Sequence, residues 1–162
     1  MFTIIHTASA SCKEAALMIA NSLGDSRTLD FESILNNPGL FDNFENLGFV
    51  FEKEGRGVPR PVISFISEIL GGLELNALNR LDYLFSVCVC GGGAGYALKI
   101  VERLCRQAGC APSLSMALSE AEVKNPSAMT ALASKIKNGD IELAKGAFGT
   151  DLYMRLHGIR IK

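Results

Sequence analysis

Small residues and hydroxyl groups are concentrated in one short turn near the start of the chain. Residues Thr7 to Ser11 read Thr-Ala-Ser-Ala-Ser, and they join an apolar run at residues 2–5 to a helix-patterned segment, Cys12 to Leu23. The first N–H groups of a helix have no partner inside it, and the helix dipole leaves them partly positive. Because small side chains let an anion approach such N–H groups, this turn predicts a phosphate-binding site.

Each hydroxyl of this turn has a second interpretation. Ser11 and Glu14 match the Ser-x-x-Glu capping box, which predicts that the helix begins near Ser11. Thr7, Ser9 and Ser11 are therefore either phosphate donors or capping residues. Cys12, next to them, is either a thiol whose pKa is lowered by the helix N-terminus or a small residue that fills the turn.

Two further loops carry chemical signals. The glycine run Gly91-Gly92-Gly93-Ala94-Gly95 follows the apolar segment Tyr83 to Cys90. Glycine lets a backbone approach a ligand closely, so this run predicts either backbone contact with a ligand or a simple tight turn. The loop from Glu52 to Pro61 is polar and holds two glycines and two prolines, and its charged residues are by default a solvated surface.

The elements that position these loops alternate between strands and helices. This alternation predicts βαβ units and a parallel sheet that helices cover on both faces. Ligands of such sheets bind beyond the carboxyl ends of the strands, so residues 6–11, 52–60 and 90–95 are predicted to share one edge. The expected strands are residues 2–5, 27–31, 47–51, 83–90 and 114–118, and the expected helices are 12–23, 61–70, 97–108, 126–137 and 140–147, with a helical turn at 31–35.

Length and charge limit the functional classes. The 162 residues, 48% hydrophobic and 20% charged, predict a single domain over residues 1–162 with a frayed tail at 155–162. The net charge of −1 gives no bulk attraction to nucleic acid or anionic lipid. No apolar run approaches the ~18 residues of a membrane span, and no signal peptide is recognisable. We expect a cytoplasmic protein that binds neither nucleic acid nor membranes.

Cysteine and histidine usage argues against two kinds of site. The cysteines are odd in number and lie in apolar segments, so reduced thiols are expected rather than a disulfide framework. No Cys-x-x-Cys occurs, and the two histidines do not complete a ligand set, so no metal site is predicted. No Ser-His-Asp or paired-carboxylate set can be assembled, so no catalytic residue is predicted. The residues concerned are Cys12, Cys88, Cys90, Cys105, Cys110, His6 and His157.

Two nucleotide-binding motifs fit the sequence poorly. A Rossmann fingerprint that starts with Gly91-x-Gly93 needs a third glycine where Tyr96 stands. The glycine run also comes too late in the chain to leave a second mononucleotide-binding half. A P-loop needs Gly-Lys followed by Ser or Thr, a tripeptide that the sequence lacks.

The three loops and their spacing resemble those of the flavodoxin-like family, and most of all its short bacterial flavodoxin-domain members. The resemblance covers residues 2–140. In the family the first loop reads approximately Ser-Gly-Thr-Gly-Asn-Ser and wraps the phosphate of FMN. The hydroxyls of Thr7 and Ser9 match this pattern, whereas Ala8 and Ala10 stand in place of glycines. Alanine is tolerated there only where φ is negative.

The other two loops match to different degrees. The second family loop reads Phe-Pro-x-Tyr followed by Gly and Pro, and its aromatic residue stacks on the isoalloxazine ring. Residues 51–59 keep this frame, with Glu52 in place of the proline and Glu54 in place of the aromatic residue. A carboxylate there would repel the reduced, anionic ring and lacks stacking area. The third family loop, Thr-x-Gly-Gly-x-x-Gly, is matched best, by Cys90 to Gly95.

The resemblance implies an α/β, flavodoxin-like three-layer sandwich with a five-stranded parallel sheet of order 2-1-3-4-5 and helices on both faces. It also implies non-covalent FMN binding and a role in electron transfer, or as an NAD(P)H-linked flavin or quinone reductase. A redox partner protein is implied, and a homodimer is left open. The implied FMN-binding residues are Thr7, Ala8, Ser9, Ala10, Ser11, Cys12, Glu52, Glu54, Gly55, Cys90, Gly91, Gly92, Gly93, Gly95 and Tyr96.

Two alternatives come from the departures from the family pattern. Ala8, Ala10 and Glu54 favour a flavodoxin-fold binding or regulatory module that has lost flavin binding. A thiol-based activity at Cys12 is the second alternative. Tyr96 and Phe51 are the aromatic residues that could replace the missing stacking partner.

Overall fold

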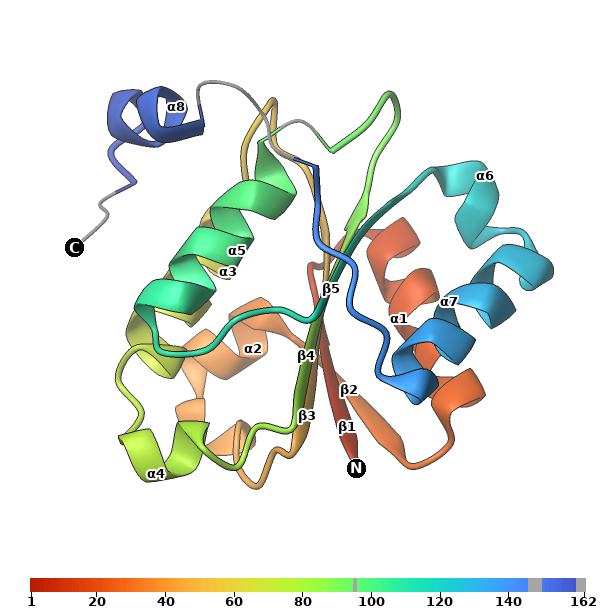
Figure 1. The fold of residues 1–162 in the computed structure, drawn as a ribbon, viewed down its shortest axis with the longest axis horizontal. Coiled ribbons are helices and arrows are strands. Elements are labelled where there is room, and N and C mark those ends of the chain that lie inside the picture. Colours follow the sequence, from red (N-terminus) through yellow and green to blue (C-terminus); the bar gives the residue numbers. More distant parts are fainter. Residues whose placement is uncertain (95, 146–149, 160–162) are drawn as a thin grey trace.

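The protein is described from a computed structural model, over residues 1–94, 96–145 and 150–159. Five strands form one parallel sheet of order β2-β1-β3-β4-β5, as predicted. All their carboxyl ends lie at one edge, the upper edge in Figure 1. The strands are β1 (Phe2–His6), β2 (Ser26–Asp30), β3 (Asn46–Glu52), β4 (Tyr83–Val89) and β5 (Leu114–Leu118).

Helices cover both faces of the sheet, which confirms the three layers (Figure 1). One face is covered by α1 (Ala10–Leu23), α6 (Glu120–Val123) and α7 (Pro126–Asn138). The other is covered by α2 (Phe31–Asn36), by α3 (Arg60–Ser64) with its π-helical continuation η2 (Phe65–Leu70), and by α5 (Ala97–Gln107). The remaining elements are the 3₁₀ turn η1 (Pro38–Leu40), α4 (Leu75–Leu78) and α8 (Thr150–Leu156).

The central strands are apolar on both sides, because each of their faces packs against helices. On β1, Ile4 belongs to the core beneath α1 and α7, whereas Ile5 belongs to the core beneath α3 and α5. Val50 and Phe51 divide in the same way on β3. This burial explains the continuous apolar runs in the sequence, which are typical of strands in parallel sheets.

The segment after α7 differs from the prediction. A helix was expected over residues 140–147, but residues 140–145 are extended, and 146 and 147 lie outside the described residues. Glu142 forms a parallel bridge with Leu114, the first residue of edge strand β5. Ala144 N–H donates to Oε1 of Glu102 at 2.9 Å. Glu102 is only 2% exposed, so its carboxylate needs a hydrogen-bond donor from the protein. That carboxylate, together with the unpaired backbone groups at the edge of the sheet, accounts for the extended conformation.

Helix α8 was not predicted, and neither were the short helices α4 and α6. Residues 155 and 156 fall in the segment expected to be frayed, and they form the last turn of α8. Met154 of this helix is fully buried, and Ile159 N–H donates to its carbonyl oxygen at 2.9 Å. Among the helices of the described residues, none is long and apolar enough to cross a membrane.

Candidate functional site

Three loops meet at the carboxyl edge of the sheet, at residues 7–9, at 53–59, and at 90–94 with Tyr96 (Figure 1). Two hydrogen bonds tie the second loop to the third. Tyr96 N–H donates to the carbonyl oxygen of Arg56 at 3.2 Å, and Lys53 Nζ donates to that of Gly93 at 3.0 Å. These two loops therefore form one connected wall.

Helix α1 begins earlier than its sequence pattern predicted. Ser9 is the N-cap residue, with extended φ and ψ of −64° and 146°, and its hydroxyl accepts from Cys12 N–H at 3.3 Å. Ser11 lies inside the first turn, and its hydroxyl donates to Oε1 of Glu120 at 3.4 Å. The predicted capping role of Ser11 is thus wrong, because a serine two residues earlier satisfies the free N–H first.

The two alanines of this turn fit without strain. In the described part of the chain Asn43 is the only non-glycine residue with positive φ, so Ala8 and Ala10 both have negative φ. These two positions therefore do not need the positive φ values that glycine adopts easily. The N–H groups of Ala10 and Ser11, in the first turn of the helix, have no acceptor inside it. The turn therefore keeps the features that let a helix N-terminus bind an anion.

Thr7 has a side chain that the protein itself does not satisfy. The residue is only 7% exposed, and its Oγ1 has no hydrogen-bond partner among the described residues. The Cys12 thiol lies near, but a thiol is a weak partner and no bond of normal geometry joins them. His6 is also buried, and its Nδ1 bonds to the carbonyl oxygen of Thr7 at 2.8 Å. Leaving a buried hydroxyl unpaired costs about 1–3 kcal/mol.

Thr7 is one of the residues that line a small cavity of about 210 Å³. Its lining includes Thr7, Ala8 and Ser9 of the first loop and the acidic residues Glu32 and Glu52. None of the residues lining it is Lys or Arg. An anion held here would depend on N–H groups, hydroxyls and the dipole of the 14-residue helix α1 rather than on a cation. The remaining lining residues are Phe31, Pro59 and Pro61.

Cys12 is fully buried beneath the turn. Burial raises the pKa of its thiol, and the negative charge of Glu52 raises it further. A raised pKa leaves the thiol protonated and weakly nucleophilic at neutral pH. Cys12 therefore fills the turn, and its environment argues against a reactive thiol.

The second loop turns away from this cavity after Glu52. Glu54 and Gly57 exchange two backbone hydrogen bonds, of 3.1 and 2.9 Å, which close a tight turn with Gly55 at a φ of 61°. Glu54 and Gly55 instead line a larger groove on the outer side of this turn. The structure thus separates the predicted site residues of this loop: Glu52 lies beside Thr7, and Glu54 does not.

Gly91, Gly92 and Gly93 of the third loop are open to solvent. Gly92 and Gly93 have φ values of 76° and 89°, which side chains rarely adopt. A Cβ added at Gly91 would meet no atom within 4 Å. This exposed backbone leaves room for a flat group against it. Cys90 is buried at the end of β4, whereas Gly95 lies outside the described residues.

Neither aromatic residue considered as a stacking partner is free. Phe51 is fully buried. Tyr96 stacks on Tyr153 of α8, with ring centroids 4.9 Å apart, and Tyr153 stacks on His157 at 4.0 Å. Sequence reasoning assigned Tyr153 and His157 no place at this site, because Tyr153 lies next to the segment expected to be frayed and His157 lies within it. Their spacing of four residues, which places side chains on one face of a helix, was the available signal.

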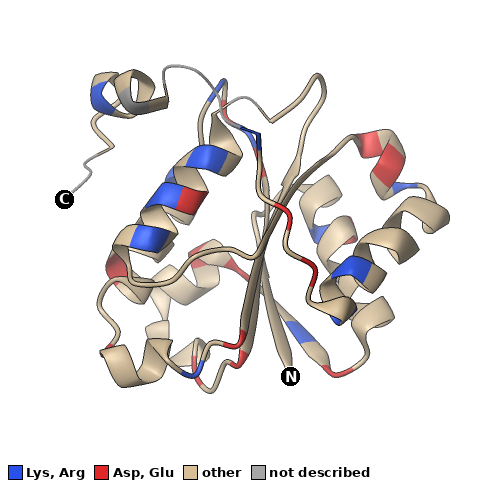
Figure 2. Cartoon of the chain, viewed as in Figure 1, with Lys and Arg blue, Asp and Glu red and all other residues tan. Residues whose placement is uncertain are grey.

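Charge is distributed unevenly around this edge of the sheet. Figure 2 shows positive residues along the outer face of α5 and negative residues on α6. Within the described residues, no group of three or more His, Cys, Asp or Glu could hold a metal ion.

Comparison with known proteins gives a clear result for the fold. No family model matches the sequence, and no curated protein matches it. Solved structures do match. A flavodoxin from Megasphaera elsdenii, in its two-electron reduced form, has a TM-score of 0.60 at 12% identity, with 83% of this chain and 99% of that one covered. The fold is flavodoxin-like.

Other flavodoxin-like structures extend the comparison. A flavodoxin from Streptococcus pneumoniae has a TM-score of 0.57 at 16% identity, covering 85% of this chain and 97% of that one. General stress protein 14 from Treponema denticola, solved in complex with FMN, has a TM-score of 0.57 at 10% identity over 85% and 97% of the two chains. At these identities the likeness concerns the flavodoxin-like fold, and the ligand must be argued from this chain's own residues.

Proposed function

We propose that the protein binds FMN non-covalently at the carboxyl edge of the sheet. The phosphate would lie in the cavity at Thr7, and the ring between the loops at 52–55 and 90–96. The observation that carries this proposal is the unpaired Oγ1 of Thr7, buried at the N-terminus of a long helix. A phosphate oxygen would supply the missing acceptor, and the adjacent N–H groups would share its charge.

The two ends of FMN are supported to different degrees. At the phosphate end, the negative φ of Ala8 and Ala10 keeps the turn compatible with an anion. At the ring end, the exposed backbone of Gly91 to Gly93 would line one edge of the ring. Lys53, bonded to Gly93 O, would place a positive charge near it. No aromatic side chain of these two loops is free to stack on the ring.

Bound FMN supplies one- and two-electron redox chemistry, and the chain would bind and orient it. We infer a role in electron transfer, with a redox partner protein, or as an NAD(P)H-linked flavin or quinone reductase. The nearly neutral net charge of the chain favours a reductase or a fixed partner over a strongly acidic shuttle. The five free cysteines, four of them buried, fit a cytoplasmic location.

A second candidate function is a binding or regulatory module that uses this fold without flavin. Three observations favour it: Glu54 stands where a stacking residue is expected, Phe51 is buried, and Tyr96 is covered by Tyr153. Glu32 and Glu52 beside the phosphate cavity add repulsion against an anion.

Titration of the purified protein separates the two candidates. FMN fluorescence should be quenched with one site per chain, and riboflavin, which lacks the phosphate, should bind at least tenfold more weakly. This difference reflects the loss of charge-assisted hydrogen bonds at the α1 turn. If FMN and riboflavin both remain unquenched, the second candidate holds. If they bind equally, the phosphate does not lie in this cavity.

A further inference from the structure

A second, much larger hollow lies outside the edge where FMN is proposed to bind. It is a groove of about 1250 Å³ between the 54–58 turn, the helix formed by α3 and η2, helix α5, and α8. Of the residues predicted to bind FMN, only Glu54 and Gly55 line it. The proposed flavin site does not account for this groove.

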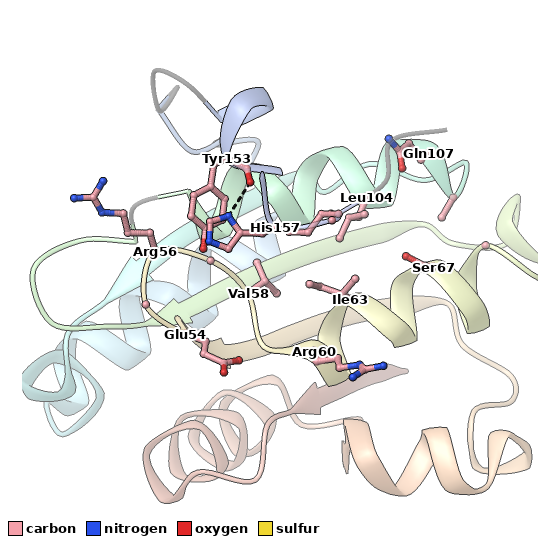
Figure 3. Close-up of a pocket in the computed structure, with 16 residues that line it drawn as sticks. Glu54, Arg56, Val58, Arg60, Ile63, Ser67, Leu104, Gln107, Tyr153 and His157 are labelled. Carbon is pink, nitrogen blue, oxygen red and sulfur yellow. Dashed lines mark hydrogen bonds between the residues drawn. The ribbon is translucent and has the colours of Figure 1, made fainter. Parts of the chain in front are cut away.

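The middle of the groove is apolar. Figure 3 shows Val58 and Ile63 on one side and Leu104 of α5 on the other. Val58 and Leu104 belong to the core beneath α5, and Ile63 packs against that core. Side chains of this kind suit the hydrocarbon or aromatic body of a ligand, since ligand pockets are lined mainly by apolar groups with a few polar ones.

Aromatic rings close the groove from above. Tyr153 projects from α8 and His157 from the turn directly after it, and His157 Nδ1 bonds to the carbonyl oxygen of Tyr153 at 2.9 Å (Figure 3). The stacked pair also contacts the turn, because a Cβ on Gly57 would lie 2.5 Å from Oη of Tyr153. Helix α8 is therefore held over the groove by direct packing rather than by the chain connection alone.

The groove also carries an exposed arginine, Arg60. Arg60 is the first residue of α3, where the helix dipole disfavours a cation. Its exposed guanidinium makes no ion pair or hydrogen bond within the described residues, although Glu54 lines the same groove. The charged residues that line the groove are Arg56, Arg60 and Glu54, which together carry a net charge of +1. At the far end, Ser67 and Gln107 offer uncharged polar groups.

We propose that this groove binds a small organic anion with an apolar or aromatic body, of the carboxylate or sulfonate class. Arg60 binds the anionic group, since guanidinium matches the geometry of planar and tetrahedral oxyanions. Val58, Ile63 and Leu104 contact the body, and Tyr153 covers it. This site does not depend on the flavin proposal, and FMN is itself an aromatic anion, so the test must separate the two sites.

The probe is 1-anilinonaphthalene-8-sulfonate, with N-phenyl-1-naphthylamine as its uncharged counterpart. We expect saturable enhancement of sulfonate fluorescence at one site per chain, and about fivefold weaker sulfonate binding in Arg60→Gln. The uncharged counterpart should bind Arg60→Gln and the native protein equally. Ser67→Trp, which fills the far end from an exposed position, should weaken both probes.

Arg80→Gln is the matched control, because Arg80 is also exposed but follows α4, outside the groove. The proposal is overturned if the sulfonate does not bind, if Arg80→Gln weakens it as much as Arg60→Gln, or if Ser67→Trp binds both probes normally. Competition by FMN that disappears in Thr7→Val would also overturn it, by assigning the probe to the edge of the sheet. Circular dichroism of each variant excludes partly unfolded protein as the source of the fluorescence.

Discussion

At the scale of single residues, Thr7 links the stability of the protein to its proposed ligand. Its hydroxyl is buried and has no hydrogen-bond partner among the described residues, so it destabilises the ligand-free protein. Valine has nearly the same shape without the hydroxyl. We predict that Thr7→Val leaves the free energy of unfolding of the ligand-free protein unchanged or raises it by up to ~1 kcal/mol, while FMN affinity falls about tenfold.

Urea unfolding and FMN titration measure these two effects on the same variant. Thr130→Val, on the exposed surface of α7, is the control and should change neither quantity by much. A Thr7→Val variant that is strongly destabilised would show that the hydroxyl already has a partner in the protein.

The cysteines also differ at this scale. Burial raises the pKa of Cys12, whereas a hydrogen bond with the Cys105 thiol lowers the pKa of the half-buried Cys110. Since the thiolate is the nucleophile, we predict that a short pulse of iodoacetamide at neutral pH modifies Cys110 first. Peptide mass spectrometry identifies the modified residue, and Cys110→Ser should remove the fast phase. Equally fast modification of Cys12 in the folded protein would contradict this prediction and support a thiol-based activity at Cys12.

At the scale of elements, α8 and the 54–57 turn depend on each other. Gly57 has a negative φ, so an added methyl group would not strain its backbone, but it would collide with Tyr153 Oη. We predict that Gly57→Ala destabilises the protein by ~1–2 kcal/mol or detaches α8. In a Tyr153→Phe background, which lacks the hydroxyl, the same substitution should cost less.

A double-mutant cycle measured by thermal or urea unfolding gives this coupling energy. Gly91→Ala is the control for stability, since its Cβ would enter open space. Full additivity of Gly57→Ala and Tyr153→Phe would show that α8 does not pack on the turn.

Sequence patterns predicted the elements well where burial alone decides them. The apolar runs of β1, β3 and β4 and the two-sided pattern of α5 required only burial, and the resemblance supplied the strand order. Residues 140–145 were mispredicted because their conformation depends on the free edge of β5 and the buried Glu102, which no local pattern reveals. The start of α1 depended on a choice between Ser9 and Ser11, which are chemically equivalent in the sequence.

At the scale of the whole molecule, the sheet edge brings together loops that are far apart in the sequence. The sequence predicted this meeting of the three loops, because parallel strands share their carboxyl edge. It could not predict that Glu52 and Glu54 would face different hollows, or that Tyr153 would cover Tyr96. The first fact depends on the tight turn between Glu54 and Gly57, and the second on helix α8, whose sequence has no strong hydrophobic pattern.

The central claim is that the turn between β1 and α1 holds the phosphate of FMN. A titration followed by backbone amide NMR tests it directly, because the N–H groups of residues 8–11 would themselves bind the phosphate. We predict that FMN causes the largest shifts at residues 7–11, with further shifts at Gly91 to Gly93, and that Thr7→Val reduces them. Shifts absent from residues 7–11, or confined to the groove residues at 54–63 and 104–108, would contradict the account.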